Sequence, residues 1–180
     1  MNPPRILVAG VGNIFLGDDA FGVEVVRELL RRPLPDEVRV VDFGICGLDL
    51  VYALLDGYEA VILVDATPRG GKPGTLYVLE VEPPAPTEAG PAELTVEGHN
   101  LDPVRVLRLA AAMGRVRRLR VVGCEPGPPG DVEEMAAGLS TPVRAAVGEA
   151  VALVESLVAQ LLAARNDNPI SEPEVESCPS

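Results

Sequence analysis

The chain has 180 residues, enough for one domain with a sizeable core, and 47% of them are hydrophobic although only 3% are aromatic. The formal net charge of −12 argues against binding to nucleic acid or to an anionic membrane surface, because both require clustered Lys and Arg. The three cysteines form no CxxC pair. We find neither a signal peptide nor an apolar run of the roughly 20 residues that span a bilayer. We therefore expect a cytoplasmic protein.

The first part of the chain alternates between short apolar runs and segments with helical spacing. The runs at residues 5–9 and 60–64 are apolar on both faces, as buried parallel strands are, and residues 38–43 form a further strand between them. Two segments with helical character separate them, at residues 20–30 and 48–55. Successive strand–helix–strand units form right-handed parallel crossovers, so the sequence predicts a three-layer α/β domain.

The middle of the chain predicts a further strand, a loop and a helix. Residues 75–81 form a strand that we place antiparallel to the strand at 60–64, because the glycine-rich link between them is short. Residues 83–98 are acidic and rich in Pro, which is typical of a long loop. Asp102 and Pro103 are a suitable N-cap and first residue for a helix that continues to Met113.

The last part of the chain predicts one more strand and a long helix. The strand covers residues 119–124, and we interpret the basic run beside it as a solvated rim, formed by Arg115, Arg117, Arg118 and Arg120. A final helix begins at Thr141 and carries an apolar stripe of Val143, Val147, Val151, Val154 and Val158. The acidic, Pro-containing segment after Arg165 has almost nothing to bury. We therefore assign residues 1–165 to a single domain and 166–180 to a disordered tail.

Acidic side chains and the one histidine fall near the ends of predicted strands. In an open α/β sheet, ligands bind outside the carboxyl ends of the strands, where the strand order reverses. If the first and third strands are neighbours, Asp19 and Asp65 share one crevice, and His99 reaches the same edge just before the helix at 102–113. Two carboxylates and one imidazole would suit a divalent transition metal such as nickel or zinc.

Each of these residues also has a structural interpretation. Asp18, next to Asp19, is better explained as a cap of the first helix than as a ligand. Asp65 could bond to the turn at Thr67, and His99 could be an isolated surface histidine. The three predicted ligands are far apart in sequence, so spacing alone does not decide between the two interpretations.

Four other residues lie near the same strand ends. Asp42 could support the site or belong to a turn, and Glu125 points to the same edge of the sheet. For Cys46 and Cys124 we favour buried packing over thiolate chemistry.

A dinucleotide-binding loop is the first alternative for the glycines after the first strand. Gly10 and Gly12 match the first two glycines of GxGxxG, but Phe15 occupies the third position. The two adjacent carboxylates at 18 and 19 would also repel a pyrophosphate. We therefore rank this interpretation low.

Five segments in the same order resemble the [NiFe]-hydrogenase maturation proteases: GVGNIFLGDDAFGV, DFGICGLDL, VILVDA with PGTLYVL, GHNLDPVRVL and VVGCEP. The likeness covers about positions 5–160, and five segments in register make it specific. It implies a twisted five-stranded, mostly parallel sheet flanked by helices. It also implies an endopeptidase that removes a C-terminal peptide from the precursor of the hydrogenase large subunit once nickel has been inserted.

The resemblance also implies roles for individual residues. Asp19, Asp65 and His99 stand where the family contacts the metal, and they are the trio that the topology brings together. Asp42 is a further catalytic candidate, because an acid recurs there in the family. Some members carry Glu in place of Asp19, and the shorter side chain can shift the geometry of the site.

Two mechanisms are compatible with this resemblance. In the one we favour, the site binds nickel that the precursor's cysteine thiolates already hold, and so recognises a mature precursor. In the other, a metal in the site assists hydrolysis and Asp19 or Asp65 accepts a proton. The alternatives are a non-proteolytic nickel-binding maturation chaperone on the same fold and a generic small-molecule α/β enzyme. We expect the large-subunit precursor as partner, and a monomer.

Overall fold

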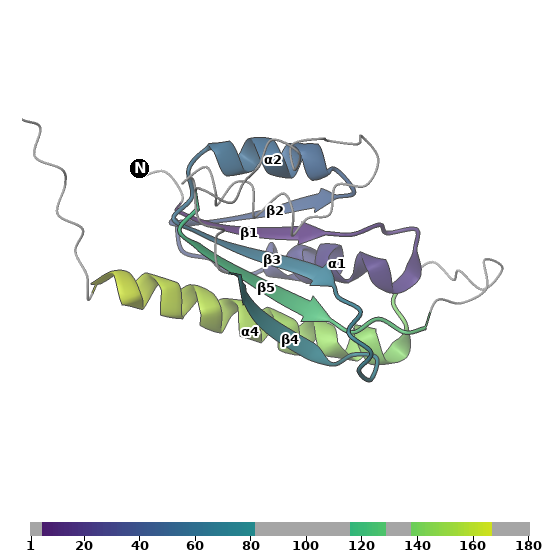
Figure 1. The fold of residues 1–180 in the computed structure, drawn as a ribbon. Coiled ribbons are helices and arrows are strands. Elements are labelled where there is room, and N and C mark those ends of the chain that lie inside the picture. The colour runs from purple at the N-terminus through teal and green to yellow at the C-terminus, as the bar shows by residue number, and fades with distance from the viewer. Residues whose placement is uncertain (1–4, 82–115, 129–137, 167–180) are drawn as a thin grey trace, which may run out of the picture.

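The computed structural model describes residues 5–81, 116–128 and 138–166, which form a five-stranded sheet with helices on both faces (Figure 1). The strands are β1 (Ile6–Val11), β2 (Val38–Gly44), β3 (Ala60–Ala66), β4 (Leu76–Val81) and β5 (Arg118–Cys124). The helical elements are the short 3-10 helix η1 (Gly17–Ala20), α1 (Phe21–Leu29), α2 (Gly47–Leu55) and α4 (Thr141–Asn166). The predicted α/β fold with a mostly parallel sheet is confirmed.

The strand order β2-β1-β3-β5-β4 places β1 between β2 and β3. Gly10 of β1 lies opposite Asp42 on one side and opposite Val64 on the other, and both pairings are parallel. The chain thus leaves β1 towards β2 and returns to β3 on the other side of β1. The strand order therefore reverses between β1 and β3, and the prediction that the first and third strands are neighbours is confirmed.

The predicted pairing of the strand at residues 75–81 with the third strand is wrong. β4 is antiparallel as expected, but it pairs with β5, where Glu80 lies opposite Arg120. Both edges of β3 are occupied, by β1 and by β5, so β4 extends the sheet at the outer edge of β5. The short link is still sufficient because it crosses the end of β5, where the Thr67 N–H donates to the Cys124 carbonyl at 2.8 Å.

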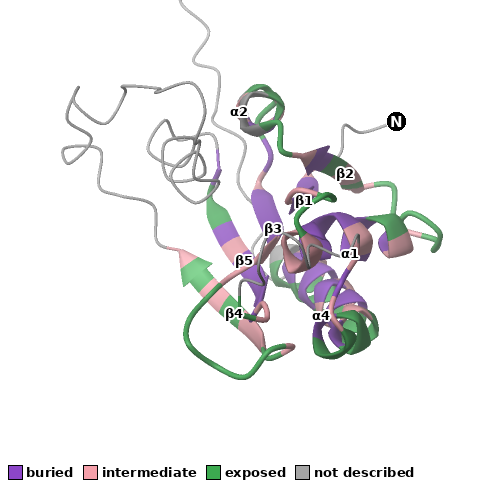
Figure 2. Cartoon of the chain, turned by 90° about the vertical axis from the view of Figure 1, so that its right-hand side faces the viewer, coloured by how far each residue is buried: buried purple, intermediate pink, exposed green. Residues whose placement is uncertain are grey.

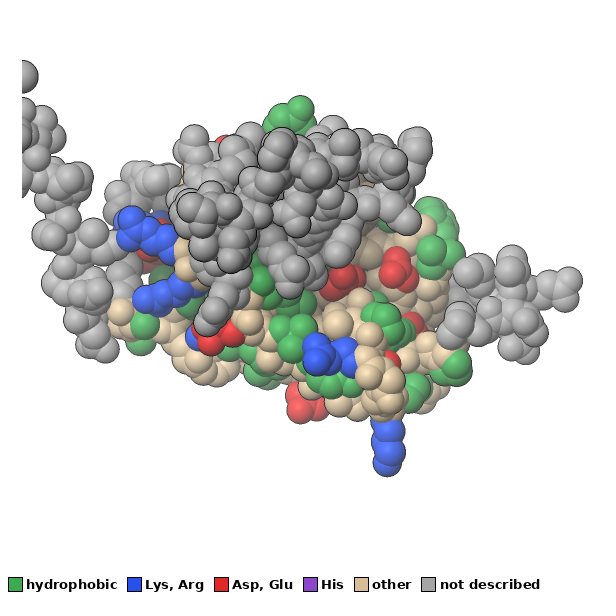
Figure 3. All heavy atoms as spheres, viewed as in Figure 1, with side chains coloured by type: hydrophobic (Ala, Val, Ile, Leu, Met, Phe, Trp, Pro, Cys, Tyr) green, Lys and Arg blue, Asp and Glu red, His purple; other side chains and the backbone are tan. Residues whose placement is uncertain are grey.

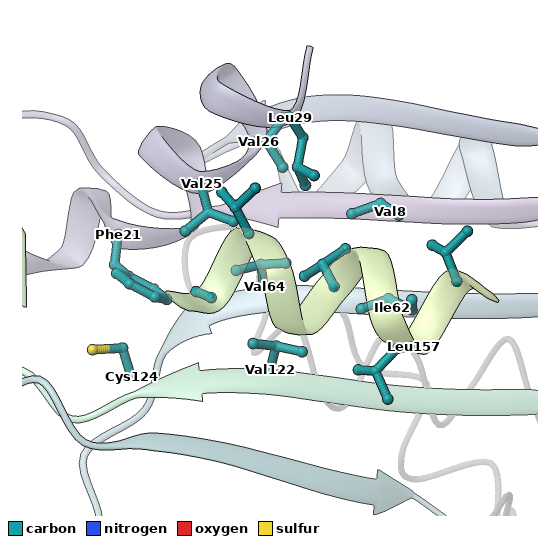
Figure 4. Close-up of a cluster of buried hydrophobic side chains, with 14 of the residues drawn as sticks. Val8, Phe21, Val25, Val26, Leu29, Ile62, Val64, Val122, Cys124 and Leu157 are labelled. Carbon is teal, nitrogen blue, oxygen red and sulfur yellow. The ribbon is translucent and has the colours of Figure 1, made fainter. Parts of the chain in front are cut away.

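Successive side chains of the strands divide between two hydrophobic clusters on the two faces of the sheet. Ile6 and Val8 belong to the cluster under α1 and α4, whereas Leu7 and Ala9 belong to the cluster under α2. Figure 4 shows the first cluster, in which residues of α1 and α4 lie over β1, β3 and β5. Burial on both faces is why these strands are apolar without alternation.

Helix α4 supplies a buried stripe to the first cluster. Val143, Val151, Val154 and Val158 are buried as predicted, while Val147 is only partly buried. By length and composition the span Thr141–Ala164 could cross a membrane, so the expectation that no run is long and apolar enough is wrong. Core helices of soluble proteins can be equally long and apolar, and the buried valines of α4 belong to the first cluster.

Several predicted segments lie outside the described residues. They are the loop at 83–98, the helix at 102–113, Arg115 and residues 167–180 of the predicted tail, whose first residue, Asn166, is instead the last residue of α4. The rest of the basic run is consistent with a solvated rim, since Arg117 and Arg118 are exposed and Arg120 pairs with Glu80 at 3.5 Å.

Candidate active site

The carboxyl end of β1 continues into a tight loop that carries Asp19. Gly12 has a φ of +136°, and a Cβ there would overlap the backbone carbonyl of Asp19, so the loop folds back at a position that requires glycine. The Asn13 N–H donates to Asp19 Oδ2 at 2.6 Å. These contacts hold the half-buried Asp19 carboxylate at the end of β1.

The start of α1 packs directly on the backbones of β1 and β3. A Cβ on Gly22 would overlap the carbonyl oxygens of both Val11 and Val64. Val64 immediately precedes Asp65, so this backbone contact holds the loop with Asp19 beside the end of β3.

Asp65 is the last residue but one of β3, and its Cα lies opposite Gly123 of β5. It is half-buried and makes a polar or electrostatic interaction of its own, so it is not a free carboxylate. Asp19 and Asp65 therefore lie at the carboxyl ends of neighbouring strands, as the predicted topology requires.

His99, the third predicted ligand, lies outside the described residues. Within the described part of the chain, no group of three His, Cys, Asp or Glu side chains is arranged to hold a metal ion. Carboxylate and imidazole donors do suit nickel or zinc. The metal site of Asp19, Asp65 and His99 thus stays a prediction.

Asp42 ends β2 on the other side of β1, and its contacts are those of a turn residue. Its Oδ1 accepts a hydrogen bond from the Gly44 N–H at 2.9 Å, and its Oδ2 lies 3.5 Å from Arg27 Nε of α1. Of the two interpretations offered by the sequence, these contacts support the turn. Its catalytic role stays a prediction.

Asp18 links three distant parts of the chain. Its carboxylate accepts hydrogen bonds from the Gly127 N–H at 2.7 Å, the Ser140 N–H at 2.6 Å and the Ser140 hydroxyl at 2.8 Å. The expectation that it caps the first helix is wrong, because neither η1 nor α1 has a side-chain cap. Asp18 instead joins the loop of Asp19 to the segment after β5 and to the start of α4.

Replacing Asp18 by Ala is expected to lower the free energy of unfolding by about 2–4 kcal/mol, because hydrogen bonds to a charged group are lost and their donors are left without an acceptor. Urea denaturation near neutral pH measures the change. The exposed Asp36 offers a matched control, and Asp36→Ala should change stability by less than about 0.5 kcal/mol. Equal stabilities of the two variants would contradict the linking role.

Glu125 is a buried carboxylate at the same edge of the sheet, with 5% of its surface exposed. It accepts hydrogen bonds from the Arg69 N–H at 2.8 and 3.0 Å, the Gly70 N–H at 3.0 Å and the Tyr77 hydroxyl at 2.8 Å. Burial alone would raise the pKa of Glu125, but the hydrogen bonds from Tyr77 and the backbone outweigh it and lower the pKa. In turn, the bond to Glu125 raises the pKa of Tyr77. This cluster fixes the loop that follows Asp65.

Replacing Glu125 by Gln tests this cluster through its pH dependence. Since the pKa of Glu125 is lowered in the folded protein, its charge stabilises the fold fully above the ordinary value of 4.5, and this stabilisation is lost as the pH falls through the folded-state value. The stability difference between the unaltered protein and Glu125→Gln should therefore shrink on acidification, as measured by urea unfolding at a series of pH values. The exposed Glu149 gives the control variant Glu149→Gln. A difference that is constant with pH would contradict the cluster.

The two described cysteines have different environments. Cys124 is buried, and burial together with the nearby Asp18 carboxylate raises the pKa of its thiol to about 11. The thiol is therefore neutral near pH 7, as expected for a packing residue and not for a nucleophile. Cys46 is exposed, so its predicted burial is wrong.

Sequence reasoning missed the partners of Asp18 and Glu125. The available signal was that both residues lie near the ends of predicted strands. Their hydrogen-bond donors are distant in sequence, 109 and 122 residues away for Asp18 and 48 to 56 residues away for Glu125. Figure 3 shows acidic side chains on the right-hand part of the described surface, the side towards which β1, β3 and β5 run in Figure 1.

A protein-family model described as "Hydrogenase maturation protease" matches residues 23–157. The matched range includes Asp42, Asp65 and His99, and it begins after Asp19.

Curated relatives cover most of the chain. The hydrogenase expression/formation protein HupD of Rhizobium leguminosarum bv. viciae is 35% identical over 150 residues, which are 82% of this chain and 71% of HupD. The hydrogenase 2 maturation protease of Escherichia coli K12 is 32% identical over 168 residues, which are 91% of this chain and 92% of that protein.

Solved structures have the same fold. The hydrogenase maturating endopeptidase HybD from Escherichia coli superposes with a TM-score of 0.61 at 31% identity, covering 91% of this chain and 93% of HybD. A hydrogenase 2 maturation peptidase from a Thaumarchaeota archaeon gives a TM-score of 0.63 at 31% identity, covering 86% of this chain and 98% of that one.

Proposed function

The chain belongs to the hydrogenase maturation protease family, and from this premise we propose that it removes the C-terminal peptide of a [NiFe]-hydrogenase large-subunit precursor after nickel insertion. The observation that carries the proposal is the position of Asp19 and Asp65 at the carboxyl ends of the adjacent strands β1 and β3, where the strand order reverses. An open α/β sheet binds its ligands at this point.

Nickel enters this proposal as part of the substrate, bound by the precursor before the protease arrives. Asp19, Asp65 and His99 would contact it there, since carboxylates and an imidazole are suitable nickel ligands. A precursor without nickel would lack this contact and would be left uncut.

Hydrolysis of the peptide bond also needs a base that takes a proton from the attacking water. Asp19 and Asp65 are our candidates for that base. Asp19 Oδ2 is occupied by the Asn13 N–H, and within the described residues Oδ1 has no hydrogen-bond donor, which favours Oδ1 as the reacting oxygen. Asp42 is less suited, because both of its oxygens are engaged, by Gly44 and Arg27. The proposal extends to a monomeric enzyme that acts in the cytoplasm.

The experiment that tests this function is the intact mass of large-subunit precursors, nickel-loaded or nickel-free, after incubation with the protein. Candidate precursors are screened one by one. Loss of one C-terminal peptide from a nickel-loaded precursor alone supports the proposal. Nickel-dependent binding without cutting would favour a maturation chaperone, and neither cutting nor binding across the candidates would overturn the proposal.

A further inference from the structure

Four large apolar side chains are exposed beside the candidate site, in the loops that follow β1 and β2. Ile14, Phe15, Leu16 and Ile45 expose 39%, 75%, 44% and 75% of their surfaces, and we refer to them as the loop patch. The Gly12 N–H donates to the Gly44 carbonyl at 2.9 Å, which joins the two loops just before these residues. Figure 2 views the molecule from this end of the sheet.

Local hydrogen bonds hold the backbone of the first loop in place. The Phe15 N–H donates to the Asn13 side chain at 2.9 Å, and the Leu16 N–H donates to the Asn13 carbonyl at 3.0 Å. Asp19 closes the same turn, because its N–H donates to the Leu16 carbonyl at 3.2 Å. A single exposed apolar residue is ordinary, but a group of them on an ordered loop marks a contact surface.

The charge around the loop patch indicates what its partner carries. Asp19 lies in η1 just after the first loop, Asp42 lies near the end of β2 just before the second, and the whole chain has a net charge of −12. Arg27, the cation near Asp42, is already paired with Glu24 at 2.9 Å and with Asp42 at 3.5 Å. A complementary partner is therefore apolar where it meets the patch and basic at the flanks.

We propose that the loop patch docks the large-subunit precursor, through an apolar segment flanked by basic side chains, and so brings the cleavage point to Asp19 and Asp65. The inference rests on the proposed function, because the precursor is its occupant. The position supports it: the Asn13 N–H bonded to the Asp19 carboxylate immediately precedes Ile14, so a chain seated on the patch continues directly to the candidate site.

The test compares Phe15→Ala and Ile45→Ala with the unaltered protein. Nickel-loaded large-subunit precursors are the probe, and both the Kd of the complex and the kcat and KM of cutting are measured. Each variant should raise Kd and KM about tenfold or more while kcat stays within about twofold, because the removed contact acts in binding alone. The matched control is Leu30→Ala, which removes another exposed leucine, 56% exposed, just beyond the other end of α1. It should change neither constant.

Failure of the docking proposal can be told from failure of the proposed function. Cutting with Kd and KM unchanged in both variants would overturn docking and leave the protease function intact. Binding that is weakened by Phe15→Ala, in the absence of any cutting by the unaltered protein, would support docking and overturn proteolysis. A variant with a lower kcat and an unchanged Kd would overturn docking. So would an unaltered protein that sediments as a dimer, if Phe15→Ala converts it to a monomer. No binding to any precursor overturns both proposals.

Discussion

Gly22→Ala is expected to lower the free energy of unfolding by about 3 kcal/mol or more, which is a large part of the stability of a domain of this size. The added Cβ would overlap the backbone carbonyls of Val11 and Val64 at once, and neither is the flexible end of a side chain that could move away. Helix α1 would have to separate from the ends of β1 and β3. Urea denaturation monitored by circular dichroism measures the loss.

Gly148→Ala is the matched control, because Gly148 is also a helical glycine. It lies exposed in α4, and nothing is within 4 Å of the Cβ that the substitution would add. Alanine has the higher helix propensity, so this variant should be more stable than the unaltered protein by roughly 0.5–1 kcal/mol. If Gly22→Ala were as well tolerated as Gly148→Ala, α1 would not pack on the strand backbones as described.

The strands could be predicted from the sequence because their apolar pattern follows directly from burial. β1 and residues 60–64 of β3 are covered on both faces, so these positions carry no charged or polar side chain and the pattern does not depend on which face is buried. The pairing of β4 could not be predicted in the same way. Its own residues and its short link to β3 fit either neighbour, and the choice was decided by β5, which enters the sheet only after residue 117 and occupies the edge of β3.

The candidate site was predictable to the extent that it depends on strand ends. Asp19 and Asp65 follow from the strand order alone, whereas the contacts of Asp18 depend on where Ser140 comes to lie, 122 residues away. Adjacent acids thus differ in their contacts: both oxygens of Asp18 accept hydrogen bonds that hold the loop, whereas among the described residues Asp19 accepts a hydrogen bond at Oδ2 alone, from the Asn13 N–H. The sequence alone, with two adjacent aspartates, does not indicate which of them has which role.

Asp19→Asn is expected to reduce processing of a nickel-loaded precursor by about 100-fold or more, mainly in kcat. Asparagine is neutral, so it neither accepts a proton near pH 7 nor matches a carboxylate as a ligand for a divalent cation. Its side-chain oxygen can still accept the hydrogen bond from the Asn13 N–H, so the loop and the fold should be retained. Intact mass of the precursor over time gives the rate, and urea denaturation verifies the fold.

Asp36→Asn is the control for charge. Asp36 is exposed just before the amino-terminal end of β2, whereas Asp19 lies beyond the carboxyl end of β1. It removes one negative charge from the same net total, so a general loss of attraction for a basic precursor would affect both variants alike. A rate for Asp19→Asn within about threefold of that for Asp36→Asn would exclude Asp19 from the chemistry and from nickel recognition. His99→Ala should match Asp19→Asn if the imidazole and the carboxylate contact the same ion. The loop patch is separable from both, because Phe15→Ala should leave kcat within about twofold of that of the unaltered protein, whereas Asp19→Asn should lower it.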